Sequence, residues 1–397
     1  MIVLDIIVLY LGKGQVTCER TLPEKLSNGD DNNVFLVVTN QYPFQVRMKV
    51  LEELPEQFQV RDKTFTIDLA PGERTVITYI VRPSERGEYH FGKTNLYAST
   101  MVGLIERRVA AGEDTMVPVY PGFLQMRKYE FLAISNRSME FGIKRMRRVG
   151  HSYEFDQIRK YVQGDDIRSV NWKATARSAD LMVNQYQDER AQNVYVILNV
   201  GRVMKMPFKG LTLLDHAVNS ALIMLNVALN KDDKAGLITF SNKIHASLTA
   251  SNKHAQLNAI LETLYNVKTD FAEADYESMY YNLTKTVKQR SLLLMYVNFE
   301  SMFSLQRELT YLKRLARKHL VVVIFFKNTE LYNLTEKQAV DTEGIYIRTI
   351  ASKFMYEKEL IAKELERFGI QSILTTPENL TVDAINKYLE LKMRGMI

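Results

Sequence analysis

Apolar and polar positions alternate along the chain from residue 14 to residue 120. Runs such as Val34–Thr39, Val46–Leu51 and Thr75–Val81 are separated by turn residues, among them Ala70-Pro-Gly72. A period of two, broken by frequent turns and without helical spacing, is typical of strands that bury one face. The pattern predicts an immunoglobulin-like β-sandwich at 14–120, with roughly six to nine strands.

After residue 150 the pattern changes to alternating strands and helices. Val194–Leu198, Leu292–Val297 and Leu320–Phe326 are almost entirely apolar, as expected of strands buried on both faces of a parallel sheet. Leucines at helical spacing between the strands, and the run Leu211–Leu229, predict amphipathic helices. The segment 353–393 adds a final helix, strand and helix. We therefore expect a doubly wound α/β domain at 151–397.

Two further segments flank the predicted sandwich. Residues 1–13 are mostly apolar but contain Asp5, and they are shorter than the roughly 20 residues that span a bilayer. Three interpretations of this stub stay open: a buried strand, an interfacial anchor, or the end of a longer spanning helix. Residues 121–150 are polar, aromatic and basic, which predicts a connector between the two domains.

Composition restricts the possible chemistry. The 397 residues are 46% hydrophobic and 25% charged, values normal for a folded protein of two or three domains. The single cysteine, Cys18, excludes an intrachain disulfide and fits a reducing compartment, and the six scattered histidines exclude a histidine-rich zinc site. The net charge of +6 is compatible with an acidic partner, an anionic membrane or nucleic acid, and requires none of them.

A distinctive motif starts at Gly164 and runs Gly-Asp-Asp-Ile-Arg-Ser-Val-Asn-Trp to residue 172, followed by Ala-Arg at 176–177. It resembles the signature of the bacterial domain-of-unknown-function family 58, which extends here over 159–186. Outside this region, Arg86-Gly87 with Phe91-Gly92, and Val119-Tyr-Pro121, are similar to the same family. The resemblance covers nearly the whole chain.

We interpret the motif as a structural lock. Asp165 and Asp166 stand where a turn enters a short helix and where carboxylates can accept amide protons. Arg168 and Arg177 are within reach of these carboxylates, and Trp172 is predicted to be a large buried anchor. The alternative is a hydrolase or metal-dependent enzyme that uses Asp165 and Asp166, but the side chains of adjacent residues in a helix or strand point apart.

The α/β part of the family resembles the von Willebrand factor A domain, which implies a divalent metal at the C-terminal ends of the strands. The family pattern places Asp-x-Ser-x-Ser in a first loop, Thr or Asp in a second and Asp in a third. The corresponding positions here are Asn199, Gly201, Val203, Thr269, Asp270 and Asn298. Glycine and valine side chains offer no oxygen, and asparagine in place of aspartate removes charge. We therefore expect a degenerate site with no metal and no cofactor.

The resemblance implies work alongside AAA+ ATPases of the MoxR type. We predict a non-catalytic, cytoplasmic adaptor that contacts such an ATPase through the degenerate loops. Arg202, Lys205 and Lys209 make their rim basic, which suits an acidic partner, although solvated loop charges are the simpler interpretation.

Two other signals are weaker. Gly87–Thr94 matches the P-loop string, but it lies in the predicted sandwich without the following helix that a phosphate site needs. Lys144–Arg148 places four cations in five residues. It is interpreted as a solvated connector, with association at the inner face of the cytoplasmic membrane as one alternative and a nucleic-acid contact as the less favoured one.

Overall fold

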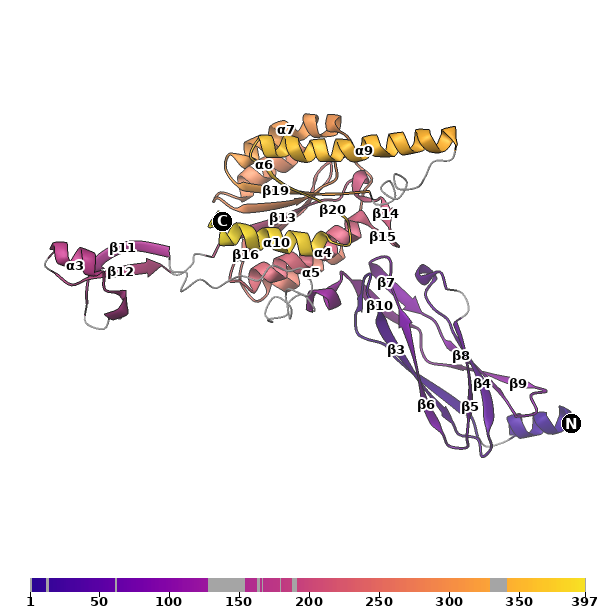
Figure 1. Ribbon diagram of the computed structural model, residues 1–397. Helices are drawn as coiled ribbons and strands as arrows, with labels where there is room; N and C mark the ends of the chain where they lie inside the picture. Colours follow the sequence, from indigo (N-terminus) through magenta and orange to yellow (C-terminus); the bar gives the residue numbers. More distant parts are fainter. Residues whose placement is uncertain are drawn as a thin grey trace.

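The computed structural model describes residues 2–11, 14–60, 63–127, 154–162, 165, 167–178, 180–187, 191–328 and 341–396. Figure 1 shows a β-rich N-terminal region and a larger α/β region, with a small third unit beside the latter. The tract Lys144–Arg148 lies outside the described residues.

The N-terminal region is a β-sandwich. Its strands form three sheets, β1 (Val16–Thr21), β3 (Asn32–Asn40) and β6 (Arg74–Val81); β2 (Leu26–Ser27), β10 (Thr115–Tyr120) and β7 (Gly87–Phe91); and β5 (Lys63–Leu69), β4 (Val46–Glu52), β8 (Thr94–Ser99) and β9 (Glu106–Ala111). Burial alternates along β3, where Val34, Leu36 and Val38 point inward. They share one core with Met48 and Val50 of β4, so the predicted period of two is confirmed.

The α/β region is built on one six-stranded sheet. Its order is β17 (Ile244–Ser251), β16 (Lys234–Phe240), β13 (Asn193–Asn199), β18 (Leu292–Tyr296), β19 (Leu320–Phe326) and β20 (Gln371–Thr375). All neighbours are parallel except β17, which runs antiparallel to β16. Every residue of β18 and β19 is buried, as the apolar runs predicted.

Helices cover both faces of this sheet (Figure 1). One core lies under α4 (Leu213–Leu229), α5 (Gln256–Tyr265) and α10 (Leu380–Met393). The other lies under α6 (Tyr276–Thr286), α7 (Met302–Ala316) and α9 (Thr342–Arg367). Side chains of β13 alternate between the two cores, Val196 entering the first and Ile197 the second. The α/β architecture that the sequence predicted is therefore present.

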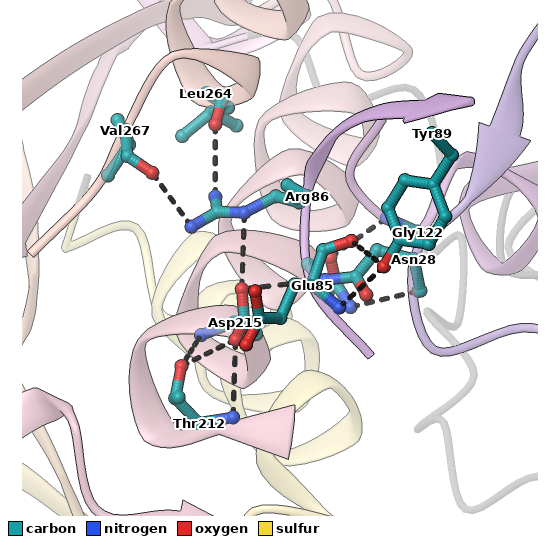
Figure 2. A network of polar contacts seen from close by, with 10 residues as sticks. Asn28, Glu85, Arg86, Tyr89, Gly122, Thr212, Asp215, Leu264 and Val267 are labelled. Atoms are coloured by element: carbon teal, nitrogen blue, oxygen red, sulfur yellow. Dashed lines mark hydrogen bonds and ion pairs between the residues drawn. The ribbon is translucent and has the colours of Figure 1, made fainter. Parts of the chain in front are cut away.

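The two domains meet at a buried polar interface, shown in Figure 2. Arg86 reaches from the sandwich into the α/β domain, where its Nη1 and Nη2 donate to the carbonyl oxygens of Leu264 and Val267 at 3.0 and 2.9 Å. Its Nε lies 3.1 Å from Oδ1 of Asp215, in the first turn of α4. Nearby, the Gly122 N–H donates to Oδ1 of Asn219 at 2.8 Å. These contacts hold the sandwich against α4 and α5.

A short helical segment precedes the sandwich. It consists of α1 (Ile2–Ile6) and the π-helical turn η1 (Ile7–Leu11). The Asp5 carboxylate is buried and accepts a hydrogen bond from Thr100 Oγ1 at 2.5 Å. Within the described residues, no helix combines the length and apolarity needed to cross a bilayer.

Candidate functional site

The loop after β13 is tightly packed around Asn199. The Asn199 side chain is 1% exposed, and its Oδ1 accepts a hydrogen bond from the Gly201 N–H at 2.8 Å. Its side chain also bonds the hydroxyl of Tyr276, a tyrosine whose pKa is raised by burial. A Cβ on Gly201 would lie 2.7 Å from the Ala272 carbonyl oxygen, so only glycine fits this position. The Asn199 side chain therefore stabilises the loop through contacts within the protein.

The loop after β18 is tied to a lysine that the sequence reasoning missed. Asn298 Oδ1 accepts a hydrogen bond from Lys358 Nζ of α9 at 2.7 Å, and Nδ2 donates to the Val203 carbonyl oxygen at 3.3 Å. Lys358 also donates to the carbonyl oxygen of Phe299. Burial lowers the pKa of Lys358 to about 8, against an opposing effect of Glu300. The signal available in the sequence was a lysine within an apolar helical stripe.

The second loop, which carries Thr269 and Asp270, contacts the hairpin of β16 and β17. Asp270 Oδ2 accepts a hydrogen bond from Ser241 Oγ at 2.5 Å and lies 3.1 Å from His245 Nε2. Burial opposes ionisation of Asp270, but the hydrogen bonds from Ser241 and the Ala272 N–H, with the His245 charge, lower its pKa. Thr269 Oγ1 accepts from the Phe271 N–H at 3.4 Å. The contacts of Asp270 thus run to the hairpin of β16 and β17, whereas those of Asn298 run to α9.

Ser241, His245 and Asp270 do not form a nucleophilic triad. In such a triad the histidine uses one ring nitrogen for the serine and the other for the aspartate. Here Ser241 Oγ and Asp270 Oδ2 both approach Nε2, at 2.8 and 3.1 Å, and Ser241 is fully buried. The cluster stabilises the hairpin and offers no exposed nucleophile.

The donors present at the metal-site positions do not fit a divalent cation. Of the six positions, only Asp270 carries a carboxylate, and its oxygens are held by Ser241 and the Ala272 N–H. Asn199 and Asn298 each direct Oδ1 to a partner within the protein. Across the described parts of the chain, no group of three or more His, Cys, Asp or Glu side chains is placed to hold a metal. Mg²⁺ and Ca²⁺ require several oxygen ligands together.

The signature region forms a small unit of its own. It consists of β11 (Glu154–Lys160) paired antiparallel with β12 (Met182–Gln187), the turn η4 (Ile167–Ser169) and α3 (Trp172–Ser178). Arg159 Nη2 and Nη1 donate hydrogen bonds to Oδ1 and Oδ2 of Asp165 at 2.6 and 2.7 Å. Oδ2 also accepts a hydrogen bond from the Val162 N–H at 2.9 Å. These bonds, that from Arg159 first, lower the pKa of Asp165. The carboxylate does accept an amide proton, but its cationic partner is Arg159.

The prediction that Trp172 is a buried anchor is wrong, because its side chain is 69% exposed. Among the described residues of this unit, two strands and a two-turn helix form a single layer, which leaves a large ring uncovered, and Figure 1 shows the unit standing apart from the six-stranded sheet. Arg177 is also exposed. Gly164, Asp166 and the Arg168 side chain lie outside the described residues.

Large apolar side chains are exposed near the loops at the C-terminal ends of the parallel strands. Phe303, in the first turn of α7 after β18, is 76% exposed, and Phe271 of the second loop is 55% exposed. Two lysines of the basic rim have partners: Lys205 Nζ lies 3.7 Å from the centre of the Phe271 ring, and Lys209 pairs with Glu378.

The P-loop-like string Gly87–Thr94 does not have the structure of a phosphate site. In it β7 is followed by strand β8 and not by a helix, so the string provides no helix N-terminus for a phosphate.

Helix α9 also exposes apolar side chains. One face of α9 carries, at helical spacing, Ile347, Ala351, Phe354, Lys358, Ile361 and Leu365. Lys358 contacts the loop that follows β18, so the sixteen helical residues before it, about 24 Å of helix, extend past the strand ends. Figure 1 shows this projection. Ile361 and Leu365 are fully buried, whereas Phe354 and Ile347 are 45% and 42% exposed.

Comparisons with known proteins give one family and several distant structural likenesses. Residues 157–352 match the family described as "Protein of unknown function DUF58". A curated relative, "Uncharacterized protein YeaD" of Bacillus subtilis (strain 168), is 26% identical over 187 residues, which cover 44% of this chain and 45% of the relative. The match thus spans less than half the length of that relative.

Among solved structures, the CARDB domain of the PF1109 protein from Pyrococcus furiosus resembles 27% of this chain and 93% of its own chain, at 23% identity and a TM-score of 0.21. The conserved hypothetical protein BatB from Bacteroides thetaiotaomicron resembles 52% of this chain and its full length, at 14% identity and a TM-score of 0.35.

Proposed function

We propose that this chain, a member of the family described as "Protein of unknown function DUF58", is a non-catalytic adaptor that binds a protein partner over the C-terminal ends of its six-stranded sheet. The observation that carries the proposal is that three elements at that edge each expose a phenylalanine, namely Phe271, Phe303 and Phe354. A large exposed aromatic side chain is a typical interface anchor, because burying it on binding releases water from much apolar surface.

The sheet supports a closer identification of the fold. Five parallel strands with one antiparallel strand at the edge, covered by helices on both faces, suit a von Willebrand factor A-like domain, and the sandwich suits an immunoglobulin-like arrangement. Open sheets of this kind gather their binding loops at the C-terminal ends of the strands. Asn199 and Asn298 end or follow β13 and β18 there, at the positions where metal ligands are expected.

The proposed partner is a MoxR-type AAA+ ATPase. The exposed phenylalanines would enter apolar pockets of the ATPase, and Arg202 and Lys205 would face acidic side chains around them. An enzymatic role for Asp165 gains no support, because Arg159 holds both of its carboxylate oxygens. The geometry therefore favours binding over hydrolysis.

The test is the affinity for the MoxR-type ATPase of the same organism, measured by biolayer interferometry. Phe303→Ser is expected to weaken binding by about tenfold or more, as for a central interface aromatic. Phe35→Ser, which changes an exposed phenylalanine of the sandwich, is the matched control and should leave the affinity unchanged. Equal affinity of wild type and Phe303→Ser, or no binding at all by wild type, would contradict the proposal.

A second surface favours peripheral contact with the inner face of the cytoplasmic membrane. Val3, Ile6, Ile7 and Tyr10 of the N-terminal segment are exposed. Asp5, the charged residue of 2–11, is buried against Thr100, so the described side chains that this helical segment exposes are apolar or aromatic. Met101, Val102 and Leu104, which follow Thr100, add further exposed apolar side chains. Such a tip can enter the boundary between headgroups and acyl chains.

Flotation with vesicles tests this contact. We expect the wild-type chain to float with vesicles that contain anionic lipid, and Ile7→Ser with Val102→Ser to reduce the floating fraction. Phe35→Ser again serves as the control. Flotation that is the same for the tip variant and the wild type would show that the tip does not carry membrane contact.

A further inference from the structure

We propose that the ammonium group of Lys358 is a built-in cation, which takes the place of a divalent metal in holding together the loops at the partner-binding edge. The inference rests on the proposed function for the role of that edge. The residues at the metal-site positions do not fit a metal, and the contacts of Lys358 all lie within this chain.

The ammonium group is placed at the junction of three elements. Lys358 Nζ of α9 donates to Asn298 Oδ1 at 2.7 Å and to the carbonyl oxygen of Phe299, both in the loop after β18. The Phe325 ring of β19 lies 6.0 Å from the same nitrogen. Two oxygen acceptors and an aromatic ring are suitable surroundings for a buried cation. A divalent ion at this position would likewise be held by loop oxygens.

The contacts of Asn298 fix the orientation of its amide. An ammonium group can only donate hydrogen bonds, so the oxygen of the amide must face Lys358. The amide nitrogen then faces the carbonyl oxygen of Val203, at 3.3 Å. Aspartate could accept from Lys358 but could not donate to Val203, so asparagine is the residue that joins both neighbours. Replacement of the metal-ligating aspartate at this position therefore fits a site that lysine fills.

Through Asn298, the lysine reaches the first loop. Val203 lies in the turn η5 (Arg202–Met204), whose Arg202 N–H donates to the Ala272 carbonyl oxygen at 3.0 Å. The chain of contacts thus runs from α9 through the loop after β18 to the loop after β13 and on to the second loop. A metal ion in a site of this type would join the same loops, but here the cationic group is covalently part of α9 and reaches the loops through hydrogen bonds.

The lysine also disfavours a metal ion at the same place. A divalent cation bound to Asn298 Oδ1 would have to displace the ammonium or lie within a few ångströms of it. Like charges at that separation repel strongly when they are shielded from water. The edge should therefore have one conformation whether or not divalent metal is present.

Hydrogen–deuterium exchange of the full chain tests the proposal, with wild type, Lys358→Met and Lys353→Met compared. Methionine keeps the length and apolar character of the lysine stem. Lys353 is an exposed lysine of the same helix, so its substitution is the matched control. We expect Lys358→Met to speed exchange in 199–204 and 298–301 by about tenfold or more, the loss expected for a charge-assisted hydrogen bond. Lys353→Met should leave both loops unchanged.

Each of two other results would overturn the proposal. One is unchanged exchange of these loops in Lys358→Met. The other is slower exchange in wild type when Mg²⁺ replaces a chelator, because that would mean a metal still orders the edge.

A second variant keeps the test decisive if Lys358→Met is poorly folded. Asn298→Ala removes the acceptor and the link to Val203, and it should speed exchange in the same two loops. The two substitutions should not add in the double variant, because both break one chain of contacts. If the effects of the two substitutions on exchange add fully in the double variant, the proposal that Lys358 and Asn298 belong to one chain of contacts is refuted. If exchange behaves as expected while Phe303→Ser binds the ATPase normally, the proposed function fails and the assignment of Lys358 stands.

Discussion

Replacing Arg86 with methionine should destabilise the protein more than any exposed charge substitution. The side chains of Arg86 and Asp215 are 7% and 8% exposed and 3.1 Å apart. Burial lowers the pKa of Arg86 and Asp215 opposes this effect, so the charge depends on its partner. Removing one member of a buried pair leaves the other uncompensated and typically costs about 3–5 kcal/mol. Arg86→Met also removes the donors to Leu264 and Val267.

The cost can be divided by a double-mutant cycle. Asp215→Asn is expected to lower the free energy of unfolding by less, because the carbonyl oxygens of Leu264 and Val267 still accept hydrogen bonds from Arg86. The amide oxygen of the variant can also still accept a hydrogen bond from Thr212, the N-cap of α4. The double variant should recover part of the summed loss, with a coupling energy on the order of 1–3 kcal/mol. The assay is urea unfolding followed by circular dichroism, with exchange at 264–267 as the local measurement.

Arg47→Met is the control for this cycle. Arg47 and Asp68 pair at 3.0 Å on the sandwich surface, with side chains 51% and 43% exposed. Water screens an exposed pair strongly, so this variant should unfold nearly as the wild type does. If Arg86→Met costs no more than Arg47→Met, or the Arg86 and Asp215 effects add fully, the interface does not depend on this ion pair.

Three further predictions follow from single contacts. The chain has one tryptophan, so the fluorescence of folded Trp172 should resemble that of indole in water, and a blue-shifted emission would mean that the ring is covered. Gly201→Ala should cost about 1–3 kcal/mol in urea unfolding, because its Cβ would meet the Ala272 carbonyl oxygen; an unchanged midpoint would show that the loop can yield. Burial lowers the pKa of His216 and of His319 in the folded chain. As the pH falls, these two histidines are therefore protonated in the unfolded chain at a higher pH than in the folded chain. Stability should therefore decrease as the pH drops below about 6.5, and His216→Gln should reduce that slope; an equal slope in the variant would exclude His216 as a cause.

Sequence patterns predicted the strands better than the contacts among loops. β18 and β19 were evident because all their residues are apolar, and β3 because its residues alternate. The packing of Trp172 was not predictable from its size, since burial depends on whether a second layer exists. The described residues of the signature region form β11, β12, η4 and α3. A short motif does not reveal how much protein will cover it.

The candidate site shows the same limit. Asn199 and Asn298 were found because each lies at the end of an apolar strand, where the chain order alone places them at one edge. Lys358 was missed because it is sixty residues from Asn298, and only the fold brings α9 against the loop after β18. Its presence among apolar positions at helical spacing was the available sign, because a lysine facing a core needs acceptors nearby.

The interdomain contact uses sandwich residues that lie outside 157–352, the region matched by the family model. Arg86 and Tyr120 belong to the motif segments of the sandwich, and both contact the α/β domain. Arg86 bonds Asp215, Leu264 and Val267, while the Tyr120 hydroxyl donates to Glu262 at 2.9 Å. A sandwich held by buried charge cannot rotate freely about a linker. In Figure 1 the N-terminal segment lies at the far end of the sandwich from the α/β domain. If that tip rests on a membrane, the sandwich acts as a rigid spacer, and the partner-binding edge is held at a fixed distance from the lipid surface.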